Sequence, residues 1–216
     1  MKRLICILVG MLFIVSILDG ETSTNTAQLP PIGKWMITQK GKPADWLGEQ
    51  YRGKKLFEPI NVIIVDGYSE NGGVAIEKLI TECKRIGYEE EEGHSSGYYG
   101  SIDNFLYEQI PDKKRIAFSD GEFYRSNNHG RIMGPAFFNG EYVFIGSFSR
   151  ESFKITDKIH HVFVSFRIAR DNFCSKLNNG PIYKIIGTYN LGNTINDVDS
   201  TTADHDGRAI VLKAIE

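Results

Sequence analysis

Polar residues that can do chemistry stand at both open ends of a predicted β-hairpin. His129 and Arg131 lie on the way into its first strand, and Ser149 and Arg150 lie on the way out of its second. Arginine holds phosphate or carboxylate through its fork of N–H donors, and histidine can act as a general base. No serine or cysteine stands in a recognisable nucleophile motif such as G-x-S-x-G, so covalent catalysis is not indicated.

The hairpin itself is indicated by Asn139-Gly140, which separates two apolar runs at residues 131–138 and 141–148. Both central residues of a type I′ turn need φ > 0, and asparagine and glycine tolerate this best, so the pattern is the strongest short-range hairpin signal. We expect the rest of the chain to be organised around this β-ribbon.

A buried strand and an amphipathic helix are predicted ahead of the hairpin. Residues 59–65 form a β-branched run that is typical of a fully buried strand. A helix follows Asn71-Gly72-Gly73, and Gly87 ends it as a C-cap would. A glycine turn between a strand and a helix can bind phosphate, but neither G-x-G-x-x-G nor G-K-[ST] occurs here. We therefore do not expect a phosphate loop.

A second helix is predicted after the hairpin, at residues 166–178. Ser165 is a suitable N-cap for it, and Asn179-Gly180 stops it. Strands are expected at residues 116–119, 161–164, 182–189 and 208–215. The stretches 89–100, 152–158 and 190–206 are expected to be loops, the first of them a solvated run of acids followed by a mobile surface loop.

These elements predict an α+β fold. Two helices with one apolar face each need one sheet face to cover. We therefore expect a two-layer sandwich, with a mixed and mostly antiparallel sheet and two main helices on one face. The order of elements is similar to a ferredoxin-like plan with extra strands.

The N-terminus has the pattern of a secretory signal. Met1-Lys2-Arg3 is basic, residues 4–18 are apolar or small, and the chain turns polar at Asp19. The apolar run of 15 residues is shorter than the roughly 20 that span a bilayer. We expect residues 1–20 to be a signal peptide or, alternatively, a membrane anchor. Residues 21–57 are expected to form a flexible tether (21–33) and an N-terminal arm, which leaves 58–216 as the domain.

Composition narrows the classes of partner. The net charge of −2 offers no electrostatic reason to bind nucleic acid or anionic lipid. Beyond the leader the chain has two cysteines, Cys83 and Cys174, each within a predicted helix. We interpret them as buried thiols, and a disulfide is the alternative in an exported protein. The segment 34–55 is locally basic, which suits a solvated face or a surface for an anionic partner.

The histidines and acids show no metal-binding spacing. His160 and His161 are adjacent, so on a strand they face opposite sides and cannot easily bind one ion. The acidic loop at 197–206 lacks the glycine and glutamate positions of an EF-hand, which leaves calcium there as a weaker alternative. We expect no metal ion and no other cofactor.

Several short signatures over residues 58–215 resemble the LssY C-terminal domain family. The matches are Glu58-Pro59-Ile60-Asn61, Gly87-Tyr88, His129-Gly130-Arg131, Gly146 through Glu151, His160 with Arg170-Asp171, and Asp206-Gly207-Arg208. The family often has acids between the last histidine and the Arg-Asp pair, where this chain has Phe163 and Arg167. The resemblance therefore does not imply an acidic metal site. Nor does it imply the activity of the membrane-embedded phosphatase-like or transporter-like segments to which the family domain is commonly fused.

The polar residues matched by this resemblance form the candidate ligand-binding set. They are His129, Arg131, Arg150, His160, Arg170 and Asp206. Several stand at strand ends, where side chains can converge on one edge of the sheet. Three roles are open: a network of hydrogen bonds and Arg–Asp pairs, a pocket for a small anion, or a catalytic site with His129 or His160 as base.

The function expected from these observations is that of an exported cell-envelope domain, in the periplasm, at the cell surface or anchored in the membrane. We expect a non-enzymatic interaction or accessory domain with a membrane or envelope protein as partner, and we assign no catalytic residue. The alternative is an envelope hydrolase or an anion- or phosphate-binding protein that uses His129, Arg131, His160 and Arg170.

Overall fold

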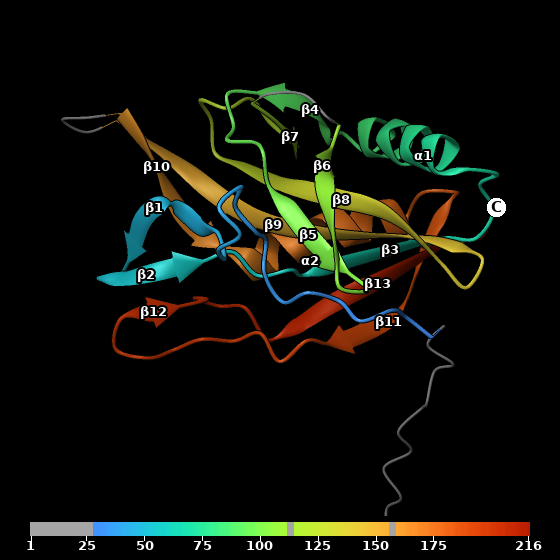
Figure 1. Cartoon of the computed structure of the whole chain (residues 1–216). Helices are drawn as coiled ribbons and strands as arrows, with labels where there is room; N and C mark the ends of the chain where they lie inside the picture. The colour runs from blue at the N-terminus through green and yellow to red at the C-terminus, as the bar shows by residue number, and fades with distance from the viewer. Residues whose placement is uncertain (1–27, 112–114, 156–158) are drawn as a thin grey trace, which may run out of the picture.

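The computed structural model describes residues 28–111, 115–155 and 159–216 (Figure 1). The predicted leader at 1–20, and the first part of the predicted tether, lie outside these residues. Within the described part of the chain, no helix is long and apolar enough to cross a membrane. Within these described residues the fold is mixed α/β, with two helices and mixed sheets.

The predicted hairpin is the centre of the fold. Strands β8 (Asn127–Phe138) and β9 (Glu141–Ile155) pair antiparallel along most of their length. Asn139 and Gly140 have φ of 48° and 84°, as a type I′ turn requires. The prediction of a loop at 152–158 is wrong for residues 152–155. Strand β9 continues to Ile155 and pairs with β10 (Ile159–Ser165). Backbone pairing needs no apolar period, so this extension was not visible in the sequence; residues 156–158 lie outside the described part.

The hairpin lies inside a sheet of ten strands. The main path runs β11 (Tyr183–Asn190), β13 (Arg208–Ala214), β3 (Val62–Asp66), β9, β8, β6 (Phe105–Ile110) and β5 (Tyr99–Ile102). The pair β13–β3 is parallel, and the other pairs of this sheet are antiparallel. The expected mixed and mostly antiparallel sheet is confirmed.

Both helices begin and end as predicted. Asn71 caps α1 (Gly72–Arg85) by accepting from the Val74 N–H, and Ser165 caps α2 (Phe166–Asn178) by accepting from the Ile168 N–H. One core joins the helices to the sheet, with Leu79, Cys83, Phe173 and Leu177 packed against Phe144, Phe148 and Leu212. Cys83 and Cys174 are buried free thiols in this core, as the first of the two interpretations predicted.

The N-terminal arm packs near a second core, which includes Met36, Ile63, Ile145 and Val211. Strands β1 (Asp45–Tyr51) and β2 (Lys54–Phe57) pair with each other, and β2 pairs with β12 (Ser200–Thr201) in a small three-stranded sheet. Residues 28–33 were expected to belong to a flexible tether, and this is wrong. They run along β5, with the Gly33 N–H donating to the Ser101 carbonyl at 2.8 Å, and main-chain bonds of this kind carry no side-chain signature.

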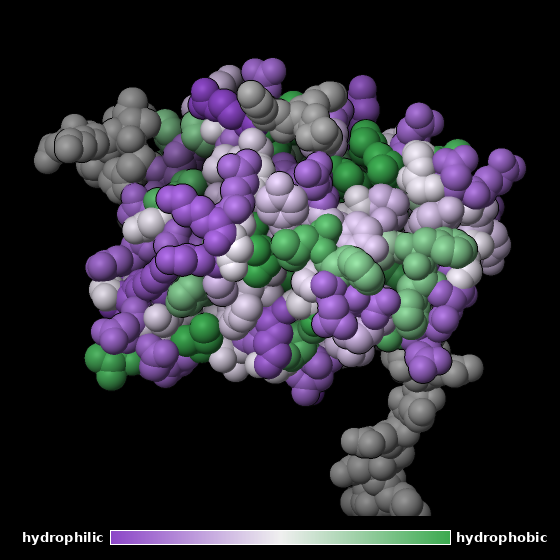
Figure 2. All heavy atoms as spheres, in the orientation of Figure 1, coloured by the Kyte–Doolittle hydropathy of each residue, from purple (hydrophilic) through white to green (hydrophobic). Residues whose placement is uncertain are grey.

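The acidic run was also interpreted wrongly. Residues 89–92 form strand β4 (Glu89–Glu92), which pairs with β7 (Ile116–Ser119). An edge strand tolerates such a run, because successive side chains alternate between faces and charge discourages further pairing. The following segment, expected to be a mobile surface loop, turns inward at His94, which is 3% exposed. Figure 2 shows one face, with apolar residues over its middle and hydrophilic ones on the β1–β2 side.

Candidate functional site

A row of buried polar side chains lies on one face of the central hairpin. Asn127, His129 and Arg131 alternate along β8, so they share a face. The pairing places Asn127 opposite Glu151 and His129 opposite Ser149, and directly opposite residues of an antiparallel pair also share a face. These five side chains belong to residues that are 1% to 3% exposed.

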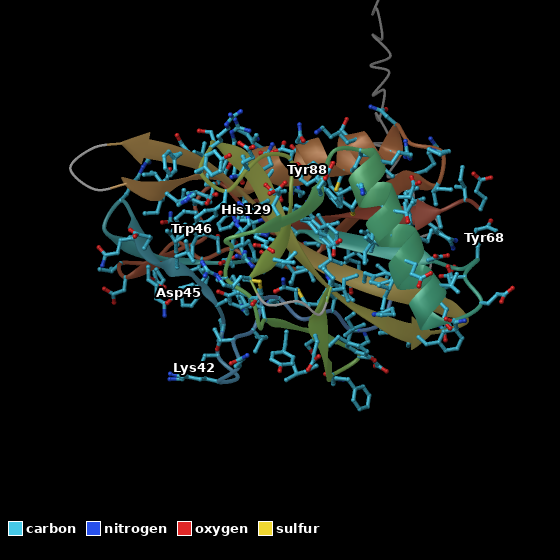
Figure 3. All side chains as sticks on the ribbon, turned by 90° about the horizontal axis from the view of Figure 1, so that it is seen from above. Lys42, Asp45, Trp46, Tyr68, Tyr88 and His129 are labelled. Atoms are coloured by element: carbon cyan, nitrogen blue, oxygen red, sulfur yellow. The ribbon has the colours of Figure 1, made fainter. Side chains whose placement is uncertain are left out.

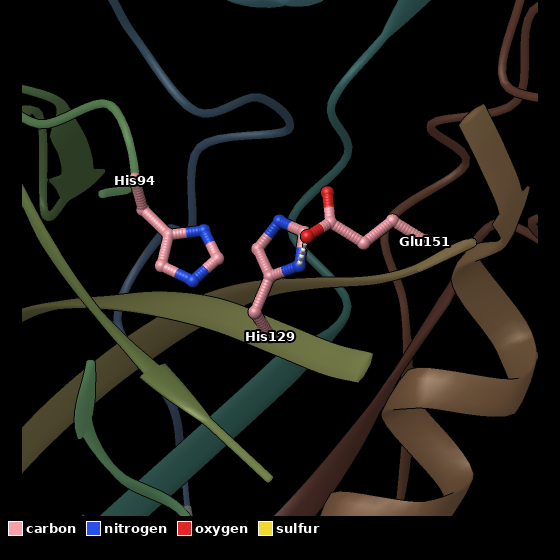
Figure 4. A group of neighbouring side chains, drawn as sticks. All are labelled: His94, His129 and Glu151. Atoms are coloured by element: carbon pink, nitrogen blue, oxygen red, sulfur yellow. Dashed lines mark ion pairs between the residues drawn. The ribbon is translucent and has the colours of Figure 1, made fainter. Parts of the chain in front are cut away.

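His94 enters this row from the segment between β4 and β5. Its ring centroid lies 4.6 Å from that of His129. One donor atom from each of His94, His129 and Glu151 lies within 4.8 Å of the other two, and all three residues are buried (Figure 4). Nε2 of His94 has no hydrogen-bond partner among the described residues. This group is called the His–Glu cluster below.

A chain of hydrogen bonds orients the His129 ring, which lies beside Trp46 in the interior (Figure 3). Trp46 Nε1 donates to Ser149 Oγ at 3.2 Å, and Ser149 Oγ lies 3.4 Å from His129 Nε2. His129 Nδ1 lies 3.0 Å from Asn127 Oδ1, which can only accept. Nδ1 therefore carries the proton, and Nε2 keeps a lone pair. Asn127 Nδ2 donates to Glu151 Oε1 at 2.9 Å.

Three residues of this row are connected as the groups of a catalytic triad are. Ser149 would be the nucleophile, His129 the base and Asn127 the group that orients the base. Ser149 is only 2% exposed, and its hydroxyl oxygen already accepts from Trp46. A substrate carbonyl cannot reach this oxygen in the structure, so the geometry does not support a hydrolase built on Ser149.

Burial sets the protonation of the cluster. It lowers the pKa of His94 to about 3, with Arg131 contributing, and it lowers the pKa of His129 well below the usual value. Both rings are therefore neutral at pH 7. Burial raises the pKa of Glu151 to about 7, against the hydrogen bond from Asn127. It also raises the pKa of Glu58 to about 7, against the charge of Arg131. The site therefore combines two neutral imidazoles with two carboxyl groups whose pKa values are raised by burial.

The predicted arginines are occupied by partners of their own. Arg131 forms an ion pair with Glu58 at 3.6 Å and donates twice to Ser95, from Nε to the carbonyl and from Nη2 to Oγ. Arg170 pairs with Asp206 at 2.7 Å and with Asp171 at 2.8 Å. Each guanidinium already binds a carboxylate, so the structure supports the network interpretation of these residues over an anion pocket.

The remaining predicted residues lie in different places. Arg150 donates to Asn128 Oδ1 at 3.1 Å. His160 lies in β10 opposite Lys154, and its side chain lies outside the described part of the structure. Of the predicted set, the structure thus brings Arg170 and Asp206 into contact and places His129 and Arg131 on one strand face. It adds His94 and Glu151, which were not in the predicted set.

Acidic side chains of the 197–206 loop serve the fold. Asp204 accepts from the Phe166 N–H and from the Ser165 hydroxyl at the start of α2. Asp197 accepts from the backbone of Asp199 and Ser200. With Asp206 held by Arg170, these carboxylates have local partners, and the calcium alternative gains no support from the geometry.

His205 of the same loop makes the stability of the protein depend on pH. Its Nε2 lies 2.7 Å from Asn193 Oδ1, and burial lowers its pKa to about 4. The folded state therefore resists a proton that the unfolded chain takes up near its ordinary value of about 6.5. The stabilisation is complete above about pH 6.5 and is lost as the pH falls toward about 4.

The free energy of unfolding should therefore fall between pH 7.5 and pH 4.5, and it should fall less in a variant without this histidine. We expect the fall in His205→Gln to be smaller than that in wild type by about 2 kcal/mol, as measured by urea titration at the two pH values. Equal losses in the two proteins would contradict this assignment.

Phe123 covers the His–Glu cluster on one side. Its ring centroid lies 5.1 Å from that of His94 and 4.3 Å from that of His161. The same residue lines a surface pocket together with Glu91, Glu92 and Glu122. Phe123 thus contacts His94 of the cluster and also lines this mainly acidic pocket.

Comparisons with models of protein families, with curated proteins and with solved structures find no match to this chain. The resemblance to the LssY C-terminal domain family stays a prediction from the short signatures alone. Function is therefore inferred from the donor atoms and the burial of the His–Glu cluster.

Proposed function

We propose that this chain is an exported cell-envelope domain that binds one divalent transition-metal ion between His94, His129 and Glu151. The observation that carries the proposal is three buried donor side chains within 4.8 Å of one another, with the Nε2 atom of His94 unpartnered. A buried polar atom without a partner costs roughly 1–3 kcal/mol, and a bound cation would offset that cost.

The donor types favour a particular class of metal. Two imidazoles and one carboxylate suit zinc, copper, nickel or cobalt, whereas magnesium and calcium prefer oxygen ligands. Tetrahedral zinc at about 2.1 Å from each ligand brings the ligand atoms to roughly 3.4 Å from one another. The cluster would contract by about 1.4 Å to reach that spacing. Asn127 contacts both His129 and Glu151, as outer-shell partners of metal ligands do.

The wider setting is also part of the proposal. The leader pattern of residues 1–20 supports export, and the lack of solvent access to His129 and Ser149 supports an accessory domain over an enzyme. A membrane or envelope protein as partner is consistent with the resemblance to the LssY C-terminal domain family. The two-layer arrangement is supported by the core that both helices share with one side of the sheet.

Thermal unfolding tests the metal-binding function directly. Protein stripped of metal is heated with Zn²⁺, Ni²⁺ or Co²⁺, and separately with Mg²⁺ or Ca²⁺. Saturation at 100 times the dissociation constant adds about 2.7 kcal/mol, which raises Tm by roughly 5–10 °C for a chain of this size. We expect that rise with the first group only, and one Zn²⁺ per chain by elemental analysis. No rise with any transition metal would refute the proposal.

A further inference from the structure

We infer that His161 supplies a fourth ligand to this centre, so that three histidines and one carboxylate enclose the metal. The inference rests on the proposed metal-binding function and extends it, because His161 decides whether the ion keeps a position open to solvent. A metal ion with four protein ligands is typical of a closed structural site, whereas three protein ligands and a water are typical of a catalytic one.

The position of the His161 ring carries the inference. Its Nδ1 lies 2.9 Å from Glu151 Oε1. The same carboxylate oxygen lies 3.8 Å from His129 Nδ1. Glu151 is thus flanked by imidazole nitrogens from two different strands, and the His161 side chain is only 11% exposed.

The pairing of β9 with β10 explains why His161 faces the cluster. His161 lies opposite Phe153, so the two side chains share a face of the ribbon. Glu151 lies two residues before Phe153 on the same strand and therefore faces the same way. The rings of Phe123 and Phe153 hold the imidazole, at centroid distances of 4.3 Å and 5.4 Å. The backbone register and the aromatic contacts together direct this ring toward Glu151.

The alternative role for His161 is that of an outer-shell partner that only orients Glu151. The two roles predict different behaviour toward small external ligands. A closed four-ligand site leaves no position for azide or imidazole on the metal. Removal of a ligand opens such a position, whereas removal of an outer-shell partner leaves the ligand set intact.

Cobalt-loaded protein distinguishes these roles, because Co²⁺ has visible absorption bands that report its ligands. We expect the wild-type spectrum to be unchanged by azide and by imidazole. His161→Ala should bind Co²⁺ at least about 100-fold more weakly, beyond the roughly 10–100-fold cost of an outer-shell loss. Added imidazole should occupy the vacated position and restore the wild-type spectrum. A His161→Ala variant that keeps the wild-type spectrum, whatever its affinity for Co²⁺, or a wild-type spectrum that shifts with azide, would overturn the inference.

Two further variants keep the result interpretable. His161→Gln retains a polar side chain of similar length, and it replaces His161→Ala if circular dichroism shows that the alanine variant is unfolded. His205→Gln changes a buried histidine outside the cluster and should bind Co²⁺ as wild type does. If wild-type protein binds no Co²⁺, the proposed function itself is refuted. If wild type binds Co²⁺ tightly and both His161→Ala and His161→Gln bind it equally tightly, only the role of His161 is refuted.

Discussion

Glu151→Gln lowers the affinity of the protein for Zn²⁺ by about 1,000-fold, which is more than the loss of an outer-shell partner costs. The change removes the anionic ligand and keeps the shape of the side chain. The amide oxygen can still accept from Asn127, whose Nδ2 lies 2.9 Å from Glu151 Oε1. The local structure should therefore persist while the charge that holds the cation is lost. Competition with a chromophoric chelator at neutral pH measures the dissociation constants of both proteins.

A matched control separates this effect from a general loss of negative charge. Glu82 is a buried glutamate of α1 that pairs with Arg85 on its own helix. Glu82→Gln should leave Zn²⁺ affinity within about threefold of wild type, because Arg85 already compensates the charge of Glu82 on a helix outside the cluster. Equal affinity of Glu151→Gln and wild type would show that Glu151 does not bind the metal.

Gly130→Ala lowers the free energy of unfolding by about 3 kcal/mol or more. This is at the upper end of what an extra methyl group costs in a well-packed core. A Cβ at this position would lie 2.3 Å from Cδ1 of Phe148, directly across the β8–β9 pair. The Phe148 ring cannot move away easily, because it stacks on Phe173 at 4.0 Å between centroids. The free energy of unfolding from urea titration measures the loss.

The size of the Phe148 ring is the proposed cause, so a smaller side chain should relieve the clash. We expect Gly130→Ala with Phe148→Leu to be less destabilised than the sum of the two single changes. Gly121→Ala is the control, since its Cβ would meet its nearest neighbour at an ordinary 3.4 Å and should cost less than about 0.5 kcal/mol. Additive effects, or a tolerated alanine at 130, would contradict this account.

The register of the central hairpin shows where inference from the sequence stops. The Asn139-Gly140 turn alone, extended without interruption, would place His129 opposite Arg150 and turn Glu151 to the other face of the sheet. The structure instead has a β-bulge between Met133 and Ala136, which shifts the pairing by one residue. Because side chains alternate along a strand, a one-residue shift exchanges the two faces. Glu151 faces His129 only because of this bulge.

The remaining donors were missed for related reasons. His94 lies in a stretch of glycine, serine and tyrosine that has the composition of a surface loop, and the pairing of β4 with β7 brings it inward. His161 was discounted because its neighbour His160 cannot share an ion with it, although a strand needs to direct only one of them at the site. An anion pocket was one of three roles left open for Arg131 and Arg170, but Glu58 and Asp206 already hold them, as the network alternative predicts.

What the amino-acid sequence determined by itself is local: the turn at Asn139-Gly140, the two helices with their caps at Asn71 and Ser165, and the buried strand ahead of α1. Each depends on φ preferences, capping side chains or apolar periodicity within a few residues. Only the tertiary structure decided that His94, His129 and Glu151 meet and that His161 contacts Glu151. Their meeting depends on a bulge, on strand pairing between distant segments and on burial, which are properties of the folded chain as a whole.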